Sequence, residues 1–534
     1  MKKIYKILLA VLSGLLLAPA YFKWGTGFIM FIALVPLLLI EHDHFLNKDK
    51  NKTKNLFWYP VITFAIFNLL TIWWVWYAHV LGAIVGIPLN TLVMTLPFMA
   101  FHYAKRNLGP RLGYFSLIVF WVAIEYLYLN VQVNFPWVLF GNAFFNDVAF
   151  IQWYEVTGVF GGTAWILILN ILFTRLLIGL NTSLSFQENK GTISWILAFL
   201  IIPIVISVVR FYTYEEEKNP YECVVLQPNI DPYEKFGGIP QSEQTNYLLE
   251  LAKASVTAET DYIIAPETFI NNRTWHSTLE HQSDVILLKR FLSDFPNAKL
   301  VIGAMTYKQY GPGDTLTNTC KPYGKEGYYY DSFNTAIQLD NSDEIPMYHK
   351  SRLVTGAEWM PSFKKFKKFQ KYAIKLGGIM RSHATQENRE SFVSPQDSCM
   401  VGPVICWESI FGEYVSKYVK DADANLLFII TNDGWWKDTA GHRQHNSFAH
   451  LRAIETRRSI ARSANTGISC LIDQRGVEID RIGWWERDYI KGTLNASDHL
   501  TFYVKHGDYL ARIAGFLGVI MILFAFVKRK SSKE

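Results

Sequence analysis

Three residues of this sequence have side chains suited to nucleophilic chemistry, and they lie at or just after an apolar strand or a turn. Cys406 ends "VGPVIC", Glu267 follows "YIIAP" and Lys350 opens "KSRLVTGAEW". A thiol with a pKa of about 8.5 is only a few per cent thiolate at neutral pH, so it needs a base, for which Glu267 is the candidate. Lys350 and the backbone N–H of Trp407 would then stabilise the oxyanion formed by attack on an ester carbonyl. Taken one at a time, a buried cysteine, a strand-end carboxylate and a solvated lysine are the commoner interpretations.

The elements around these residues are short apolar runs that alternate with amphipathic stretches. Such a pattern indicates an α/β domain with a buried sheet, in which ligand sites gather at the carboxyl ends of strands. A helix predicted over "ESIFGEYVSKYVK" would point its N-terminal dipole at Cys406 and favour the thiolate. Expected strands are 222–228, 262–266, 299–305, 333–339, 401–406, 425–431 and 467–473, with helices near 242–258, 283–294 and 445–458.

The remaining sequence is far more apolar. Hydrophobic residues make up 50% of the 534 residues and charged residues only 18%, against about 25% in soluble domains. Crossing a bilayer takes about 20 mostly apolar residues. We therefore expect membrane spans at 4–21, 24–41, 57–79, 82–103, 112–130, 157–180, 193–212 and 507–527. Residues 1–20 also imitate a signal peptide, so their retention is left open.

Lysines and arginines in the short loops give the orientation of these spans. They follow the second, fourth and sixth spans, whereas the long loop 131–156 has none. Positive residues collect on the cytoplasmic side, which places the N-terminus inside and residues 213–505 outside the cytoplasm. The final span then returns the chain to a cytoplasmic tail rich in Lys and Arg.

Composition also argues against other classes of protein. A net charge of +6 without a basic groove does not suggest nucleic-acid binding. The five cysteines lack CxxC spacing, which argues against a disulfide framework or a cysteine-rich zinc site. His442, His445 and His450 lie close in sequence, but no carboxylate or cysteine completes a convincing metal set. We expect no metal and no cofactor.

Glu267, Lys350 and Cys406 resemble, in order and spacing, the Glu-Lys-Cys triad of the nitrilase superfamily. The segments "LQPNIDPYEKF", "APETF", "HKSRLVTGAEWMP", "ICWES", "TNDGWW" and "RSANTGISCLIDQRG" are similar to those of bacterial apolipoprotein N-acyltransferases. The resemblance implies a polytopic α-helical membrane domain of about eight spans with an extracytoplasmic nitrilase-like domain, an α-β-β-α sandwich. The corresponding boundaries are 1–212, 213–505 and 506–534.

The resemblance also implies a reaction in two halves. Cys406 would take an acyl chain from a membrane phospholipid as a thioester. The N-terminal amine of a diacylglyceryl-cysteine apolipoprotein would then accept it. Exclusion of water would protect the thioester. We expect a monomeric, multi-pass protein of the bacterial inner membrane, with the catalytic domain on the periplasmic side.

Several further residues have roles implied by the same resemblance. Glu358 and Glu408 match carboxylates that assist or orient the triad, and a carboxylate pair would raise one pKa and improve Glu267 as a base. Trp407 replaces the tyrosine common beside the nucleophile, and "LVTGAEW" departs from the usual Pro-Phe-Gly-Glu turn. Candidate substrate-binding residues are Phe236, which replaces a frequent tryptophan, Trp435, Trp436, Phe363 and Phe366.

The insertion 363–400 begins with "FKKFKKFQKYAIKLGG", in which Phe363, Phe366, Phe369 and Tyr372 recur every three residues. Such a segment could lie on a lipid surface with its lysines near phosphates, as a movable lid over the acyl site. A solvated basic helix is an equal alternative.

Two other functions stay open from the sequence. A membrane-tethered amidase or nitrile hydrolase would use the same triad with water as the acceptor. A transporter with an accessory domain would show polar or Gly/Pro-broken spans in matching halves, and no paired repeat is visible.

Overall fold

The computed structural model describes residues 1–47, 53–182, 186–359, 382–393 and 398–531. The chain divides into two compact units. The first comprises residues 1–76, 80–214 and 506–534, and the second comprises 77–79 and 215–505.

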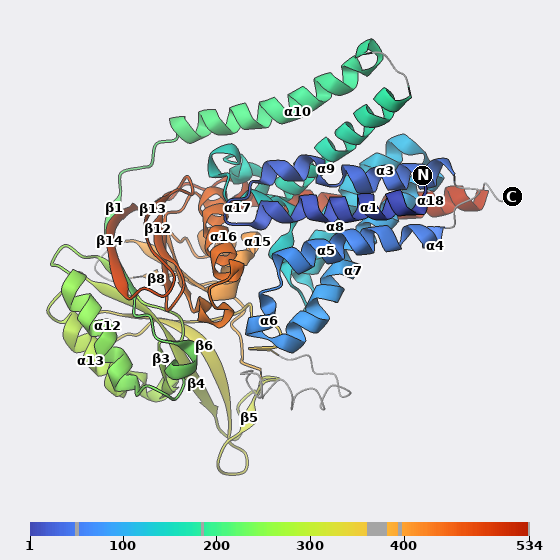
Figure 1. Cartoon of the computed structure of the whole chain (residues 1–534). Helices are drawn as coiled ribbons and strands as arrows, with labels where there is room; N and C mark the ends of the chain where they lie inside the picture. Colours follow the sequence, from blue (N-terminus) through green and yellow to red (C-terminus); the bar gives the residue numbers. More distant parts are fainter. Residues whose placement is uncertain (48–52, 183–185, 360–381, 394–397, 532–534) are drawn as a thin grey trace. The chain divides into compact units, whose positions relative to one another are not determined.

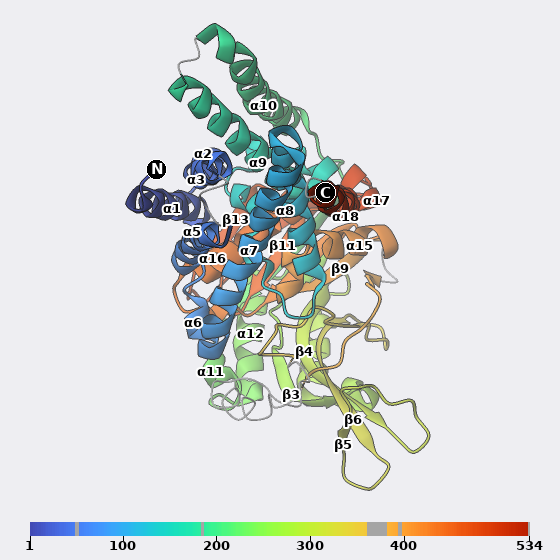
Figure 2. The same cartoon turned by 90° about the vertical axis from the view of Figure 1, so that its right-hand side faces the viewer.

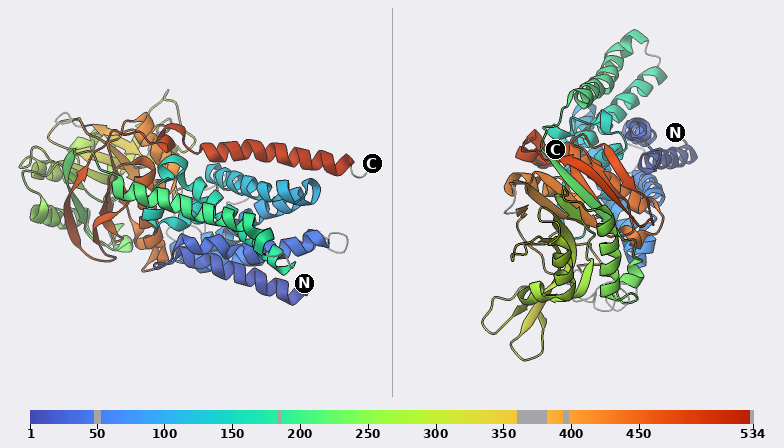
Figure 3. Two further views of the ribbon diagram at one scale, coloured as in Figure 1. Left: turned by 90° about the horizontal axis from the view of Figure 1, so that it is seen from above. Right: turned by 90° about the vertical axis from the view of Figure 1, so that its left-hand side faces the viewer.

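The first unit is helical. Seven of its described helical segments are long and apolar enough to cross a membrane, and one apolar helix is shorter. Helices of this length can cross the apolar core of a bilayer, and they satisfy their own backbone hydrogen bonds there. The first unit is therefore a multi-pass membrane domain. Its helices are α1 (Lys3–Leu17), α2 (Met30–Ala33), α3 (Val35–Leu46), α4 (Thr53–Leu56), α5 (Trp58–Thr71), α6 (Val75–Ala78, ending at the unit boundary), α7 (Val80–Leu108), α8 (Pro110–Asn130), α9 (Tyr154–Asn181), α10 (Phe186–Thr213) and α18 (Tyr509–Ser531). Figure 3 shows α18, in red, running along α8, which it contacts together with α7.

The expected span at 57–79 is shorter than predicted. Helix α5 ends at Thr71, and the chain turns before α6. The indole Nε1 of Trp74 donates to the carbonyl of Thr71 at 3.1 Å, and its buried ring packs on Trp137 with centroids 4.8 Å apart. Hydropathy alone could not reveal this packing, which turns the aromatic run away from the helix axis.

A buried glutamate holds the loop between α8 and α9 in the first unit. The carboxylate of Glu125 accepts hydrogen bonds from the backbone N–H of Phe140 at 2.9 Å and from the hydroxyl of Thr163 at 2.8 Å. The loop consists of the 3-10 turns η3 (Pro136–Val138), η4 (Phe140–Phe144) and η5 (Val148–Phe150). Polar groups inside an apolar bundle are satisfied by such contacts, which fix the loop.

The second unit is a sandwich of two sheets. Among the described residues, the first sheet has eight strands, in the order β14-β1-β2-β4-β6-β5, with β3 beside β4 and β7 beside β6. The second has six strands, in the order β13-β12-β11-β10-β9-β8. The strands are β1 (Pro220–Gln227), β2 (Tyr262–Ile264), β3 (Ile270–Trp275), β4 (Lys299–Tyr310), β5 (Lys321–Pro322), β6 (Tyr329–Leu339), β7 (Met347–His349), β8 (Phe392–Val393), β9 (Met400–Ile405), β10 (Leu426–Thr431), β11 (Ile460–Ala464), β12 (Ser469–Ile472), β13 (Glu478–Ile482) and β14 (Asp488–Asn495).

Helices cover the outer face of each sheet. Helices α12 (Gln241–Ser255) and α13 (Ser283–Leu292), in green, lie against the first sheet (Figure 1). Helices α15 (Gly412–Asp421) and α16 (Ala440–Thr456), in orange, lie against the second (Figure 2). The four layers are those of the predicted α-β-β-α sandwich. The other helices are α11 (Pro232–Lys235), η6 (His276–His281), η8 (Cys406–Ile410), η9 (Asp433–Trp436) and α17 (Phe502–His506), which ends at the unit boundary.

Three neighbouring strands in each sheet are parallel, which brings their carboxyl ends to one edge of that sheet. Strands β1, β2 and β4 run parallel in the first sheet, and β9, β10 and β11 run parallel in the second. Parallel strands buried on both faces read as continuous apolar runs, which is why the sequence revealed them.

Candidate active site

Glu267 lies on a tight turn just after β2. The residue that follows it, Thr268, has a φ of 49°, a left-handed conformation that is uncommon outside glycine. Gly303 of β4 makes room for this turn, because a Cβ there would lie 2.3 Å from the Thr268 nitrogen and 2.5 Å from the Glu267 Cα. The Nζ of buried Lys235 donates to the Glu267 carbonyl at 2.8 Å and to the Thr268 hydroxyl at 3.1 Å. The turn is thus held from two sides.

Lys350 follows β7, and its side chain reaches two carboxylates. Its backbone N–H donates to the carbonyl of Asn334 in β6 at 2.8 Å. Its Nζ donates to Glu267 Oε1 and to Glu358 Oε1, each at 2.9 Å. The Nδ2 of Asn334 donates to the same two oxygens, at 2.7 Å and 2.8 Å. One ammonium and one amide therefore link both carboxylates in a buried cluster.

The turn that carries Glu358 closes around Val354. The Val354 carbonyl accepts from the N–H groups of Ala357 and Glu358, and the Val354 N–H donates to Glu358 Oε2 at 2.9 Å. Gly356 has a φ of 89°, which glycine adopts without strain. The "LVTGAEW" sequence thus builds a glycine turn without proline.

The charges in this cluster stabilise one another. Burial acts to lower the pKa of Lys350, but the carboxylates of Glu267 and Glu358 outweigh it and hold that pKa well above its usual value. Burial acts to raise the pKa of Glu358, but the Lys350 ammonium, together with His383 and the Val354 N–H, outweighs it and lowers that pKa. The rise in pKa expected for one carboxylate of the pair does not occur at Glu358, because the Lys350 ammonium lies between the two acids.

Cys406 lies directly after β9, in a left-handed conformation with a φ of 49°. It begins the five-residue 3-10 helix η8, and α15 starts only at Gly412. The prediction of one continuous helix from 408 is wrong, because the chain is extended at Phe411. A dipole needs aligned peptide units, so the short η8 offers Cys406 far less help than the predicted helix would.

The thiol of Cys406 lies within the electrostatic reach of Glu267 and Lys350. Burial raises the pKa of Cys406 well above its usual value, the charge of Glu267 adds to this effect, and Lys350 partly opposes it. The resting residue is therefore a thiol. Proton removal by a base has to accompany attack, and Glu267 is the carboxylate whose charge acts most strongly on this thiol.

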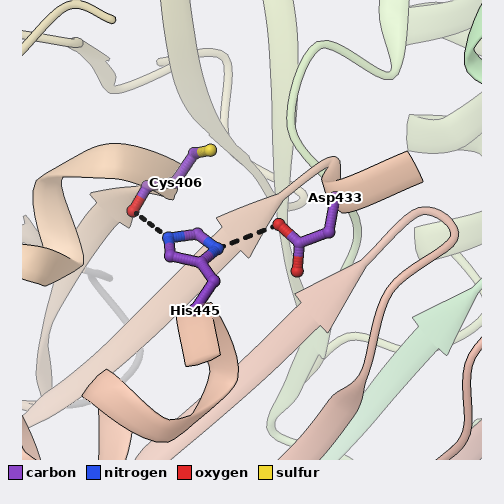
Figure 4. Close-up of side chains that lie close together, drawn as sticks. All are labelled: Cys406, Asp433 and His445. Carbon is purple, nitrogen blue, oxygen red and sulfur yellow. Dashed lines mark hydrogen bonds and ion pairs between the residues drawn. The ribbon is translucent and has the colours of Figure 1, made fainter. Parts of the chain in front are cut away.

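A second buried cluster lies behind the nucleophile. Asp433 Oδ1 is 2.9 Å from His445 Nδ1, and Asp433 Oδ2 accepts from Arg462 Nη2 at 2.6 Å. His445 Nε2 is 3.2 Å from the carbonyl oxygen of Cys406 (Figure 4). Burial acts to raise the pKa of Asp433, but Arg462 and His445 outweigh it and hold that pKa far below its usual value.

The atoms of Cys406, Asp433 and His445 that could ligate a metal lie within 4.8 Å of one another. Figure 4 shows that the contact of His445 to Cys406 ends on the carbonyl oxygen rather than the sulfur. Both ring nitrogens thus have protein partners. These three residues are therefore best explained as a hydrogen-bonded cluster that supports the turn carrying the nucleophile.

Glu408 anchors this turn to the loop that carries Lys350. Its carboxylate accepts from the N–H groups of Ser351 at 2.7 Å and Ile405 at 2.9 Å, and from the hydroxyl of Tyr414 at 2.5 Å. The hydroxyl of Tyr348 donates to it at 3.1 Å. It is fully buried, and burial raises its pKa. Trp407, beside it in η8, is also buried.

The structure brings some of the expected substrate-binding residues together. The half-exposed ring of Phe236 stacks on Trp435 with centroids 6.1 Å apart. Trp436 is buried and packs edge-on against His445 at 5.3 Å. Phe363 and Phe366 lie outside the described residues, as does most of the expected lid.

Sequence reasoning assigned no role to Lys235, Asn334, Asp433 or Arg462, and it weighed His445 only as a metal ligand. A signal existed for Asn334, an amide within the apolar run "FNTAIQL". For the remaining residues, the sequence contained no local pattern that identifies the groups they contact.

Known proteins and family models match both halves of the chain. Residues 13–172 match a family model described as Apolipoprotein N-acyltransferase N-terminal domain, and residues 237–499 match Carbon-nitrogen hydrolase. A Chlorobaculum tepidum protein called apolipoprotein N-acyltransferase is 29% identical over 98% of this chain and 97% of its own length. A Geobacter metallireducens protein of the same name is 26% identical over 98% and 96%. A Nesterenkonia amidase of the nitrilase superfamily is similar in structure, with 14% identity, a TM-score of 0.37, and coverage of 56% of this chain and 99% of the amidase.

A thiol, an ammonium and a carboxylate at the strand ends of this sandwich define a carbon–nitrogen hydrolase domain, here in one chain with apolar helices of membrane-spanning length. Both matched regions and the nearly full-length relatives agree on one family. The chain belongs to the apolipoprotein N-acyltransferase family, and it is an acyltransferase.

Proposed function

We propose that this enzyme transfers an acyl chain from a membrane phospholipid, through a thioester on Cys406, to the N-terminal amine of a diacylglyceryl-cysteine lipoprotein. The observation that carries the proposal is the buried contact of Lys350 with Glu267 and Glu358 in electrostatic reach of the Cys406 thiol. Buried charges are costly unless paired, and here each has a partner.

In the first half-reaction, Glu267 removes the thiol proton as the Cys406 sulfur attacks the ester carbonyl. The Lys350 ammonium and the Trp407 N–H stabilise the oxyanion. The ester C–O bond breaks, the proton passes from Glu267 to the leaving oxygen, and lysophospholipid departs. A thioester remains on Cys406.

In the second half-reaction, the lipoprotein amine attacks the thioester. Glu267 accepts a proton from the attacking nitrogen and returns it to the sulfur as the C–S bond breaks. An amide is formed and the thiol is restored. Phe236 and Trp435 offer apolar surface for an acyl chain, and their stacking supports that role.

Both substrates are anchored in lipid, so we place residues 213–505 at the outer, periplasmic face of the inner membrane and the C-terminus in the cytoplasm. The lysine and arginine bias of the loops supports this orientation. The enzyme acts as a monomer in this proposal, since one chain carries all the residues named. Segment 363–400 remains our candidate for a lipid-facing lid.

Mass spectrometry tests the chemistry. Purified protein incubated with phospholipid alone should gain one acyl group on the peptide containing Cys406, and an added diacylglyceryl-cysteine peptide should remove it as an amide. Cys406→Ala should gain none. Release of free fatty acid in place of the peptide amide would assign a hydrolase.

Labelling tests the orientation. In a Cys320→Ser background, Ser293→Cys places a thiol on the exposed end of α13, and Ser531→Cys places one at the exposed end of α18. A membrane-impermeant maleimide applied to spheroplasts should label the first and not the second. The reverse pattern would refute the assignment.

A further inference from the structure

Two arginine side chains share the ring of one tyrosine, whose hydroxyl donates to Glu408 in the nucleophile turn. The guanidinium carbon of Arg389 lies 4.4 Å from the ring centre of Tyr414, and that of Arg352 lies 5.7 Å from the same centre. Arg352 also lies 5.1 Å from the ring centre of Phe411. Both arginines are half-buried. Two like charges are thus held near each other against an aromatic surface.

Three segments distant in sequence build this arrangement. Arg352 lies two residues after Lys350, Arg389 precedes β8, and Tyr414 lies in the first turn of α15. The Arg352 N–H and the Tyr414 hydroxyl both donate to Glu408 Oε1, at 3.3 Å and 2.5 Å. Glu408 in turn belongs to the nucleophile turn. The arginine pair is therefore tied to the same frame as Cys406 and Lys350.

The charge of the pair is not matched by an ion pair within the described part of the chain. Both guanidinium groups make cation–π contacts there, and the Nε of Arg389 is buried without a hydrogen-bond partner. Glu408, the carboxylate whose charge acts on Arg352, already accepts hydrogen bonds from backbone N–H groups and from a tyrosine hydroxyl. A buried N–H without a partner costs free energy, which a bound anion would recover.

The chemistry of the pair favours a phosphate. Guanidinium groups present several N–H donors in a planar fork that matches phosphate oxygens, and charge-assisted bonds of this kind are the strong ones. We propose that Arg352 and Arg389 form a phosphate-binding site next to the nucleophile, and that it holds the phosphate of the phospholipid donor. This inference rests on the proposed function, and it assigns the residues that distinguish a phospholipid from other esters.

The phosphate has a clear place in the first half-reaction. The ester that Cys406 attacks and the phosphate belong to the same glycerol, so holding the phosphate positions the ester carbonyl near Lys350. The phosphate stays on the lysophospholipid that leaves. The second half-reaction, in which a lipoprotein amine attacks the thioester, does not need the site.

The test compares two acyl donors of equal chain length in single-turnover acylation of Cys406, one a phospholipid and one a phosphate-free nitrophenyl ester. Variants are Arg352→Gln, Arg389→Gln and the double variant. The matched control is Arg290→Gln, an exposed arginine of α13. We expect each single change to lower the ratio of phospholipid to nitrophenyl-ester kcat/KM about tenfold, with a larger loss in the double variant. Arg290→Gln should leave the ratio unchanged.

Inorganic phosphate provides the second arm. It should inhibit acylation by the nitrophenyl ester in the unmodified enzyme and lose this effect in the double variant. An equal loss of kcat/KM with both acyl donors, or no loss with either, would show that the two arginines do not form a phosphate-binding site. Phosphate inhibition that depends on the arginines, with an unchanged donor ratio, would assign the site to free phosphate and overturn the lipid assignment. Failure of phospholipid to acylate the unmodified enzyme, with normal ester acylation, would contradict the proposed function, while the phosphate arm still tests the arginines.

Discussion

His445 Nε2 lies 3.2 Å from the carbonyl oxygen of Cys406, which can only accept a hydrogen bond. The same nitrogen is 3.2 Å from the Ser409 hydroxyl, which itself donates to the Cys406 carbonyl at 2.8 Å. Cys406 has the left-handed φ that its neighbours must maintain. The imidazole, held by Asp433 and Arg462, thus supports the backbone that aims the sulfur.

Loss of this support should misplace the nucleophile without removing any group that touches substrate. We expect His445→Ala to lower the acylation rate constant of Cys406 about 10- to 100-fold, since a shift of about 1 Å at a reacting atom can cost that much. The KM for phospholipid should change little. His445→Gln, which keeps a donor, should recover part of the rate. A purely structural role would give equal losses for both variants.

Glu358 should matter through the proton of Lys350. Replacing it with Gln removes one of the two carboxylates that raise the pKa of Lys350, while burial still lowers that pKa. The ammonium should then lose its proton at lower pH, so the alkaline limb of the kcat/KM profile should move to lower pH. Glu358→Asp, which keeps the charge, serves as the control. An unmoved alkaline limb in Glu358→Gln would show that this carboxylate does not sustain the ammonium.

Lys235 should make stability rise with pH. Burial lowers the pKa of Lys235 to about 7, with Glu267 partly opposing, whereas the unfolded side chain titrates near 10.5. Between these values the unfolded chain holds a proton that the folded chain lacks, so raising the pH favours folding. From pH 7.5 to 9 this contribution amounts to about 2 kcal/mol.

Thermal unfolding in detergent measures this effect. The increase in Tm between pH 7.5 and 9 should be smaller in Lys235→Met than in the unmodified protein. Lys253→Met changes an exposed lysine of α12 and should retain the full increase. If Lys235→Met kept the same slope, Lys235 would be charged in the folded state.

Glu408 should contribute strongly to stability. Glu408→Ala would leave the buried donors of Ser351, Ile405, Tyr348 and Tyr414 without their acceptor, and each such loss costs about 1–3 kcal/mol. We expect a loss of at least about 3 kcal/mol in the free energy of unfolding, with Asp421→Ala at the exposed end of α15 as the control. Similar unfolding midpoints for the two variants in detergent would disprove the anchoring role.

The sequence predicted most of the fold because buried parallel strands and membrane helices both appear as apolar runs. All seven expected strands are present, although β4 and β6 extend beyond their predicted ends. Strands with mixed composition were missed, such as β3, "INNRTW", and β13, "EIDRI". These strands form because they pair with neighbouring strands, and the hydrophobic periodicity of a sequence does not show which strands pair.

The three triad positions were found because they lie at or just after apolar strands or a turn, and because their order and spacing resemble a known triad. The supporting contacts were not, since they join segments with no common local pattern. Asn334 reaches Glu267 across 67 positions, and Arg462 reaches Asp433 across 29. The helix predicted at Cys406 failed because the chain is extended at Phe411; Gly412, directly after it, was the local signal of a break.

The left-handed backbone at Cys406 also limits which atoms can ever serve as the nucleophile there. A branch at Cβ is disfavoured at positive φ, and the branched Thr268, at the same φ of 49°, has the Lys235 Nζ bonded to its hydroxyl. Serine would therefore replace Cys406 with less strain than threonine. An exchange of sulfur for oxygen at this position would therefore cause the least backbone strain through a primary alcohol.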